Sequence, residues 1–269
     1  MRRAAVLLLL AAGCVPRFDD DPALLQGPRL IAVVVQPPEA APGQPVMLRA
    51  VAAGPEGLIP APAVRWSVCT APTPPVETGS ISPACLGDLP AAGPDGETLS
   101  LSLPLDGCAR FGPDTPPGDF RPRDPDGTGG FYQPVRADWS GQTAFAFVRL
   151  ACGAGRVAVD VALEFRARYI ENQAPRPADL TVGPEALTVH WPPGTREAYA
   201  RVDPVSGSVV EDVESLTVSW FVTAGEVASA RTTGDDGSAQ VRWLAPPGPA
   251  SVFAVVRDSR GGSAVLAGP

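Results

Sequence analysis

The chain has 269 residues, with 21 basic and 29 acidic side chains and a formal net charge of −8 at neutral pH. A negative chain repels phosphate backbones, which argues against binding to nucleic acid. The 33 prolines and 28 glycines disfavour long helices, and the length accommodates two domains.

The first residues have the layout of a secretory leader. Two arginines precede an apolar run over residues 4–12, and small residues then lead into Cys14. The run is well short of the roughly 20 residues that a membrane-spanning helix needs. The sequence Ala11-Ala12-Gly13-Cys14 resembles the lipobox of bacterial lipoproteins. The alternative is an uncleaved membrane helix.

The lipobox resemblance implies that residues 1–13 are removed as a signal peptide and that Cys14 carries the lipid. Residues 14–28 would then be a tether from the membrane. Val15, rather than an aspartate, follows the cysteine. By similarity to the sorting signals of enteric bacteria, this favours the outer membrane over the inner membrane, on either its periplasmic or its surface face.

The next part of the chain reads as short strands. An apolar run over residues 29–37 precedes a Pro-Gly turn and an alternating segment from Val46 to Ala50. The segment 63–69 then places Trp66 on one face, as an immunoglobulin-type sandwich does on its third strand. This order resembles the opening of bacterial Ig-like and PKD-like domains. A β-sandwich of another topology is the alternative.

Further alternation predicts strands over residues 98–105, 142–152 and 155–169. The segment 109–134 is rich in proline, glycine and aspartate, and it is too long for an ordinary connection. We therefore expect a first Ig-like domain over residues 29–171 that carries a long, disulfide-bearing loop insertion.

Four cysteines remain once Cys14 is assigned to the lipid. They are Cys69, Cys85, Cys108 and Cys152. In an oxidising compartment an even number implies two disulfides, and four cysteines allow three connectivities. We favour Cys69–Cys85 with Cys108–Cys152, since each bond then closes one loop. A zinc site is the alternative, but there is no C-x-x-C pair and the only histidine is distant in sequence.

The second half repeats the theme after a junction at residues 171–182. A strand pattern around Trp220 is followed by Trp243 and by a hairpin whose turn spans Arg257 to Gly262. This block resembles the C-terminal half of Ig-like and PKD-type repeats. We expect an all-β chain of two tandem Ig-like β-sandwich domains, the second over residues 172–269, resembling proteobacterial lipoproteins with such domains.

One stretch of the long loop has possible metal chemistry. Asp124, Asp126 and Thr128 alternate before a glycine and resemble the first half of an EF-hand calcium loop. The glutamate expected at the twelfth position is replaced by Val135, and an ordinary Asp/Gly/Pro turn is the alternative.

The neighbouring rings of Phe131 and Tyr132 could form a contact surface for a sugar or a peptide. The alternative is that they fasten the long loop to the sandwich. General acid–base catalysis prefers histidine, and only His190 is present, beside Trp191 on an expected strand. No catalytic motif accompanies it.

We therefore expect a non-catalytic, membrane-anchored envelope lipoprotein that binds or scaffolds other envelope proteins. The alternative is a module that contacts carbohydrate or peptidoglycan through residues 109–134. Calcium is the one cofactor that the sequence suggests.

Overall fold

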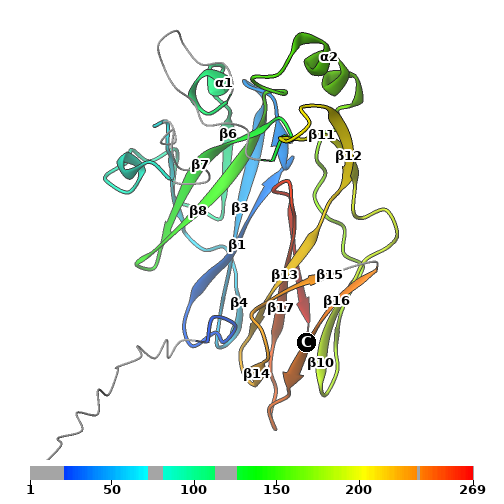
Figure 1. Cartoon of the computed structure of the whole chain (residues 1–269). Coiled ribbons are helices and arrows are strands. Elements are labelled where there is room, and N and C mark those ends of the chain that lie inside the picture. The colour runs from blue at the N-terminus through cyan, green and yellow to red at the C-terminus, as the bar shows by residue number, and fades with distance from the viewer. Residues whose placement is uncertain (1–20, 72–80, 113–125, 235–236, 269) are drawn as a thin grey trace, which may run out of the picture.

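The structure is a computed structural model that describes residues 21–71, 81–112, 126–234 and 237–268. In these ranges the chain is nearly all β (Figure 1). The exceptions are two α-helices, α1 (Gly107–Arg110) and α2 (Val159–Arg168), and a 3₁₀ turn at Pro83–Cys85. The predicted all-β fold is confirmed.

The first half forms one sandwich of two sheets. Its strands are β1 (Arg29–Gln36), β2 (Glu39–Ala40), β3 (Pro45–Gly54), β4 (Gly57–Ile59), β5 (Arg65–Val68), β6 (Thr98–Ser102), β7 (Gly130–Trp139) and β8 (Gln142–Ala151). One sheet joins β1 to β3, which pairs with both β4 and β6. The other sheet has the order β2-β8-β7-β5. This is the strand arrangement of an immunoglobulin-type sandwich.

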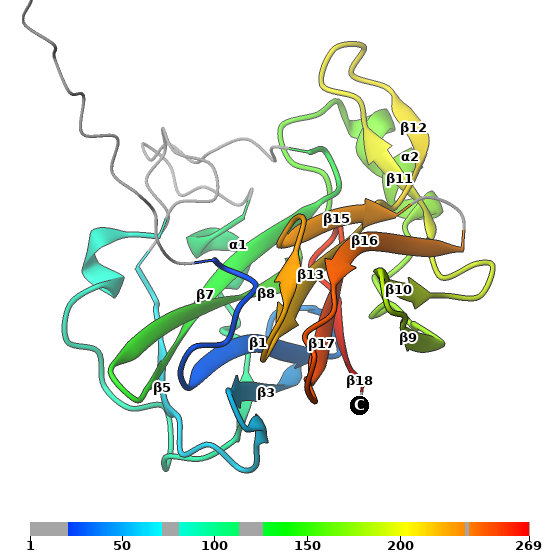
Figure 2. The same cartoon turned by 90° about the horizontal axis from the view of Figure 1, so that it is seen from below.

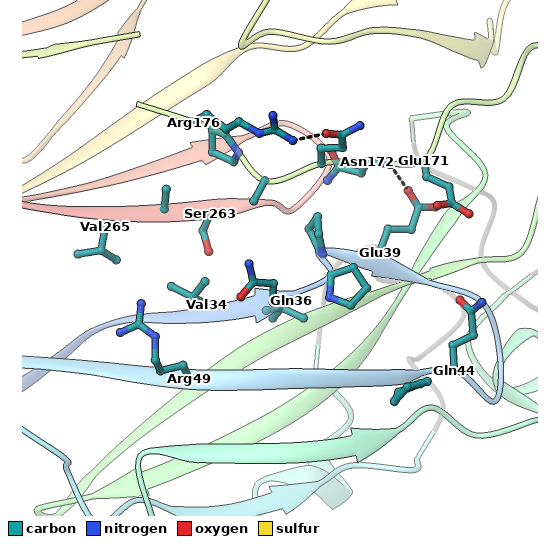
Figure 3. A pocket seen from close by; sticks show the side chains of 18 residues that line it. Val34, Gln36, Glu39, Gln44, Arg49, Glu171, Asn172, Arg176, Ser263 and Val265 are labelled. Carbon is teal, nitrogen blue, oxygen red and sulfur yellow. Dashed lines mark hydrogen bonds between the residues drawn. The ribbon is translucent and has the colours of Figure 1, made fainter. Parts of the chain in front are cut away.

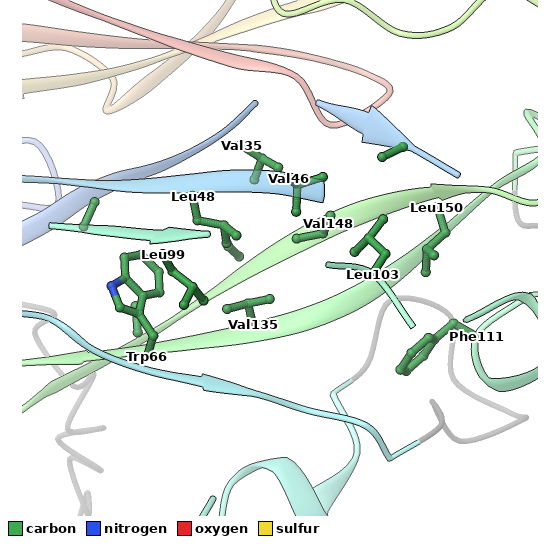
Figure 4. Close-up of a cluster of buried hydrophobic side chains, with 14 of the residues drawn as sticks. Val35, Val46, Leu48, Trp66, Leu99, Leu103, Phe111, Val135, Val148 and Leu150 are labelled. Atoms are coloured by element: carbon green, nitrogen blue, oxygen red, sulfur yellow. The ribbon is translucent and has the colours of Figure 1, made fainter. Parts of the chain in front are cut away.

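The core of this sandwich is built around a tryptophan (Figure 4). Trp66 lies on β5, is 0% exposed, and donates its indole N–H to the carbonyl oxygen of Gly96 at 2.9 Å. It shares one buried cluster with Val and Leu side chains from β3, β7 and β8, including Leu48, Val135 and Val148. The predicted burial of Trp66 is confirmed.

Both predicted disulfides are present. Cys69 follows β5 and is bonded to Cys85, and the two Cα atoms are 5.4 Å apart. Cys108 of α1 is bonded to Cys152, which follows β8, with Cα atoms 5.5 Å apart. The bonds fasten the irregular connections of the first half to its sheets.

The second half forms a sandwich of the same type. Its strands are β9 (Asp179–Val182), β10 (Ala186–His190), β11 (Ala198–Val202), β12 (Val209–Val213), β13 (Leu216–Val222), β14 (Glu226–Val227), β15 (Arg231–Gly234), β16 (Ser238–Leu244), β17 (Val252–Asp258) and β18 (Ser263–Gly268). The sheets have the orders β14-β16-β10-β9 and β15-β13-β17-β18, and β11 and β12 form a separate hairpin.

The second core also centres on a tryptophan. Trp220 on β13 is 0% exposed, and its indole N–H donates to Thr232 Oγ1 at 2.9 Å. The predicted turn between β17 and β18 is present, and Gly261 occupies it with a φ of 105°. A positive φ of this kind favours glycine, which explains the Gly-Gly pair at this point.

A third core joins the two sandwiches face to face. Ile31 and Val51 of the first half pack with Phe221, Phe253 and Val255 of the second. The sheets therefore form four successive layers, which can be followed across the view in Figure 2. Strands β1, β3, β13 and β17 lie in the two inner layers. Burial on both faces explains why the sequences of β1 and β17 are almost continuously apolar rather than alternating.

The described part of the expected tether, residues 21–28, packs against the second sandwich. Ala23 and Leu25 are 0% and 1% exposed, and Leu25 belongs to the third core. The Leu25 amide donates to the carbonyl of Val222 at 2.8 Å, and the Val222 amide donates to that of Ala23 at 2.8 Å. These residues are thus part of the folded body. The rest of the tether lies outside the described residues.

The strand predicted over residues 155–169 is wrong, because residues 159–168 form helix α2. The alternating valines suggested a strand, but Val161, Phe165 and Tyr169 also recur every four residues. That spacing places them on one face of a helix, against the β11–β12 hairpin. The alternate residues Val159 and Leu163 are exposed instead.

Strand β7 was not expected, since its first residues fall in the predicted loop 109–134. Pro134 lies within this strand, and because prolines are rare inside sheets, the sequence around it did not indicate a strand. The rest of that loop, up to residue 125, lies mostly outside the described residues.

Candidate functional site

A hollow lies where the two sandwiches meet. It is an open cleft of about 950 Å³ (Figure 3). One wall comes from the end of β1 and the start of β3, and the other from the start of β18. The connection between the halves, residues 171–176, closes one side. The lining side chains include Val34, Gln36, Arg49, Asn172, Arg176 and Val265.

The topology explains why strand edges line this cleft. Among the described strands, β1 pairs only with β3, and β18 pairs only with β17. The third core stacks β1 over β18, so that both free edges lie on the same side of the molecule. Val34 and Val265 are partly buried against that core, which gives the cleft an apolar floor.

The cleft lining carries two arginines, Arg49 and Arg176, and two carboxylates, Glu39 and Glu171. Arg49 is exposed and forms a long ion pair with Glu97, at 3.9 Å. Glu97 does not line the cleft. Arg176 donates to the neutral side-chain oxygen of Gln173 at 2.7 Å. Glu171 is the exposed carboxylate of the lining.

A buried ion pair lies beneath the cleft. Glu39 on β2 is the parallel neighbour of Arg149 on β8 and is 3.3 Å from its Nε. The carboxylate also accepts the backbone N–H of Asn172 at 2.9 Å and the hydroxyl of Tyr169. Burial alone would lower the pKa of Arg149, but the charge of Glu39 and the contact with Tyr132 leave it raised. The pair connects β2, β8 and the connection between the halves.

Arg149 also binds the segment expected to hold calcium. Its Nη2 donates to the carbonyl oxygen and to Oγ1 of Thr128, both at 3.0 Å. Asp126 Oδ1 accepts the backbone N–H of Thr128 at 3.0 Å and its hydroxyl at 2.7 Å. Gly127 accepts the amide of Val202 at 2.8 Å. Asp126 and Thr128 are therefore engaged in a turn, and Asp124 lies outside the described residues.

A second buried cluster holds the β17–β18 hairpin against the connection between the halves. Arg260, 1% exposed, donates to Glu214 Oε1 and to Glu197 Oε2, both at 2.7 Å, and to the Ile170 carbonyl at 2.8 Å. Burial, reinforced by nearby Asp258, raises the pKa of Glu214 to about 7 despite the bond from Arg260.

Asp258 shapes the turn of that hairpin. Its Oδ1 accepts the backbone N–H groups of Arg260 at 2.9 Å and Gly262 at 2.8 Å. Burial raises the pKa of Asp258 as well. The Asn172 amide reaches the same oxygen at 3.5 Å, while Asn172 Oδ1 is buried without a hydrogen-bond partner among the described atoms. Asn172 therefore brings an unsatisfied acceptor to the lining of the cleft.

The aromatic pair expected at a binding surface is mostly internal. Phe131 is 4% exposed and belongs to the first core, because β7 turns it toward Leu150 and its neighbours. Tyr132 is half-buried, and its hydroxyl is 3.2 Å from Arg149 Nη1. His190 is exposed at the end of β10. Cys14 lies outside the described residues.

Sequence reasoning missed Glu39, Arg149 and Arg260, which are the buried charges of this region. Arg149 stands in an alternating strand at a position that a solvent-facing residue would occupy. The signal that could have found Arg260 is its place within the Asp-x-Arg-Gly-Gly turn, where a long cation follows an aspartate that caps the loop.

No protein-family model and no curated protein sequence matches the chain. Within the described residues, none of the helices has the length and apolar character needed to cross a membrane. Across the same ranges, no three His, Cys, Asp or Glu side chains converge as a metal site would require.

Proposed function

We propose that this protein is a non-catalytic, lipid-anchored component of the cell envelope that binds another envelope component in the cleft between its sandwiches. Cys14 would carry the lipid and hold the protein at the outer membrane. The observation that carries the proposal is the third core, because it fixes the two cleft walls relative to each other.

The position of the cleft supports this role. The described chain begins at residue 21, next to the start of β1, whereas the cleft lies toward the other end of that strand. The seven steps between the first and last of the eight residues of β1, at about 3.3 Å each, span about 23 Å. A partner in the cleft would thus be held away from the point where the chain enters the fold.

The state of the buried carboxylates supports a binding role rather than a catalytic one. Both Glu39 and Glu214 are buried: Glu39 accepts the Asn172 backbone N–H and is ion-paired with Arg149, and Glu214 accepts from the Arg260 guanidinium and the Glu197 backbone N–H. Such bonds fix the walls of the cleft and leave little room for proton transfer to a substrate. Carbohydrate binding through Phe131 is less well supported, because that ring is in the core.

Two measurements test the proposal in the native host. Mass spectrometry should find residues 1–13 removed and a diacylglycerol thioether on Cys14, and Cys14→Ala should release the protein from the membrane. A photo-crosslinking amino acid at Gln36 should capture one envelope component. The same group at Val205, which is 93% exposed on the β11–β12 hairpin, is the control. An unmodified N-terminus, or equal capture at both positions, would contradict the proposal.

A further inference from the structure

Two neighbouring strand edges are left without the usual protection. Natural edge strands avoid pairing with other chains by carrying charged residues, prolines or bulges. Edge strands β5, β9, β14 and β15 each contain a charged residue, whereas β6, which does not line the cleft, has neither a charge nor a proline. The β1 segment 32–36, Ala-Val-Val-Val-Gln, and all of β18, Ser-Ala-Val-Leu-Ala-Gly, contain neither a charge nor a proline.

The end of the β1 segment and the first residues of β18, Ser263 to Val265, line the cleft and face each other across it (Figure 3), while the rest of β18 lies against β9. In an edge strand, every second residue directs its backbone N–H and C=O away from the sheet. A further strand could form hydrogen bonds with these groups. The bulge in β1 lies before this segment, between Leu30 and Ala32, so the register beyond it is regular. Residues 33–36 therefore offer a short, regular pairing site beside an apolar floor.

From this we propose that the cleft takes an extended peptide segment of a partner protein, which adds as a strand to the free edge of β1 and places an acidic side chain near Arg49 and Arg176. The inference rests on the proposed binding function and names the chemistry of the partner. Main-chain pairing would supply affinity, and alternate side chains would supply selectivity.

The charge of the rim favours an acidic segment. Arg49 stands opposite Val34 in the β1–β3 register, next to the pairing edge. Arg176 lies on the facing wall, where its partner is a neutral amide. Asn172, which is 4% exposed, also lines this wall, and its Oδ1 has no hydrogen-bond partner among the described atoms.

The test uses the full chain in detergent and a random nine-residue phage-displayed peptide library. Enriched peptides should alternate apolar residues and include Asp or Glu. Arg49→Glu should weaken binding by about tenfold, because a repulsive charge replaces an attractive one. Arg242→Glu is the matched control, since Arg242 is also exposed on a strand but belongs to the opposite outer sheet. It should leave binding unchanged.

A second readout separates strand addition from binding through side chains alone. The best peptide is synthesised with N-methyl groups at alternate residues, in the two possible phases. One phase should abolish binding and the other should leave it nearly intact, because only one set of amides faces β1.

The inference would be overturned if both N-methyl phases lost binding equally or if no peptide were enriched. It would also be overturned if Arg49→Glu left the affinity unchanged. So would a chitin tetrasaccharide that competes for the cleft, or a dimer of the chain that Arg49→Glu dissociates. A specific crosslink at Gln36 in the native envelope together with a failed peptide test would reject this partner chemistry and leave the proposed function standing.

Discussion

Replacing Phe253 by alanine tests whether the third core joins the two halves into one unit. Phe253 is 2% exposed and lies on β17, facing the first sandwich in the third core. Removing a fully buried phenylalanine ring costs about 3–5 kcal/mol, from lost burial and from the cavity that remains. Typical domains are stable by only about 5–15 kcal/mol, so the loss is large.

The assay is equilibrium unfolding in urea, followed both by tryptophan fluorescence and by circular dichroism. We expect one coincident transition for the native chain and one for Phe253→Ala at a much lower urea concentration. Phe147→Ala is the control, because Phe147 is 38% exposed on β8, and it should change stability by less than about 1 kcal/mol. Two separate transitions in the native chain, with Phe253→Ala moving only one, would refute the reasoning.

Three further predictions concern the buried charges and the disulfides. Arg260→Leu should cost about 3–5 kcal/mol in chemical unfolding, because it leaves the Glu214 carboxylate buried without its cation; a loss below about 1 kcal/mol would contradict this. Folding raises the pKa of Glu214 to about 7 and also raises the pKa of Asp258. Between pH 8 and pH 5 the folded state therefore binds protons that the unfolded state has lost, so the free energy of unfolding should rise as the pH falls. The thermal midpoint should increase by about 5 °C over that range. Glu214→Gln should flatten the profile to the part that Asp258 supplies; Arg260, Glu197 and Asp258 are the other charges near Glu214. Removing the Cys108–Cys152 disulfide by a double change to serine should lower the free energy of unfolding by about 4 kcal/mol, because this bond closes the longer loop. Removing the Cys69–Cys85 disulfide should cost less, and an equal or larger loss in urea unfolding would contradict this.

The sequence predicts the parts of the fold that depend on local pattern. Trp66 and Trp220 stand in alternating segments, and both lie at the centres of their sandwiches. The two disulfides follow from the pairing that closes one loop at a time. The tryptophan positions depend on a local pattern, whereas the disulfide pairing was one of three connectivities and was favoured because each bond closes one loop.

The remaining features depend on contacts between distant segments. Valines at 157, 159 and 161 fit both a strand and a helix, and packing of Phe165 against the β11–β12 hairpin selects the helix. The apolar run of β1 indicates burial but does not say which sheet covers its second face. The cleft exists only because that face meets the second sandwich, so no motif in the chain predicts it.

Native-state hydrogen exchange tests the central claim, that the two sandwiches are one cooperative body, most directly. Amides of β3 around Val51 and of β17 around Val255 lie on opposite sides of the third core. We predict that both sets exchange only through global opening and with the same free energy across increasing urea. Exchange of either set through a separate opening of much lower free energy would show that the halves unfold independently and would contradict the account.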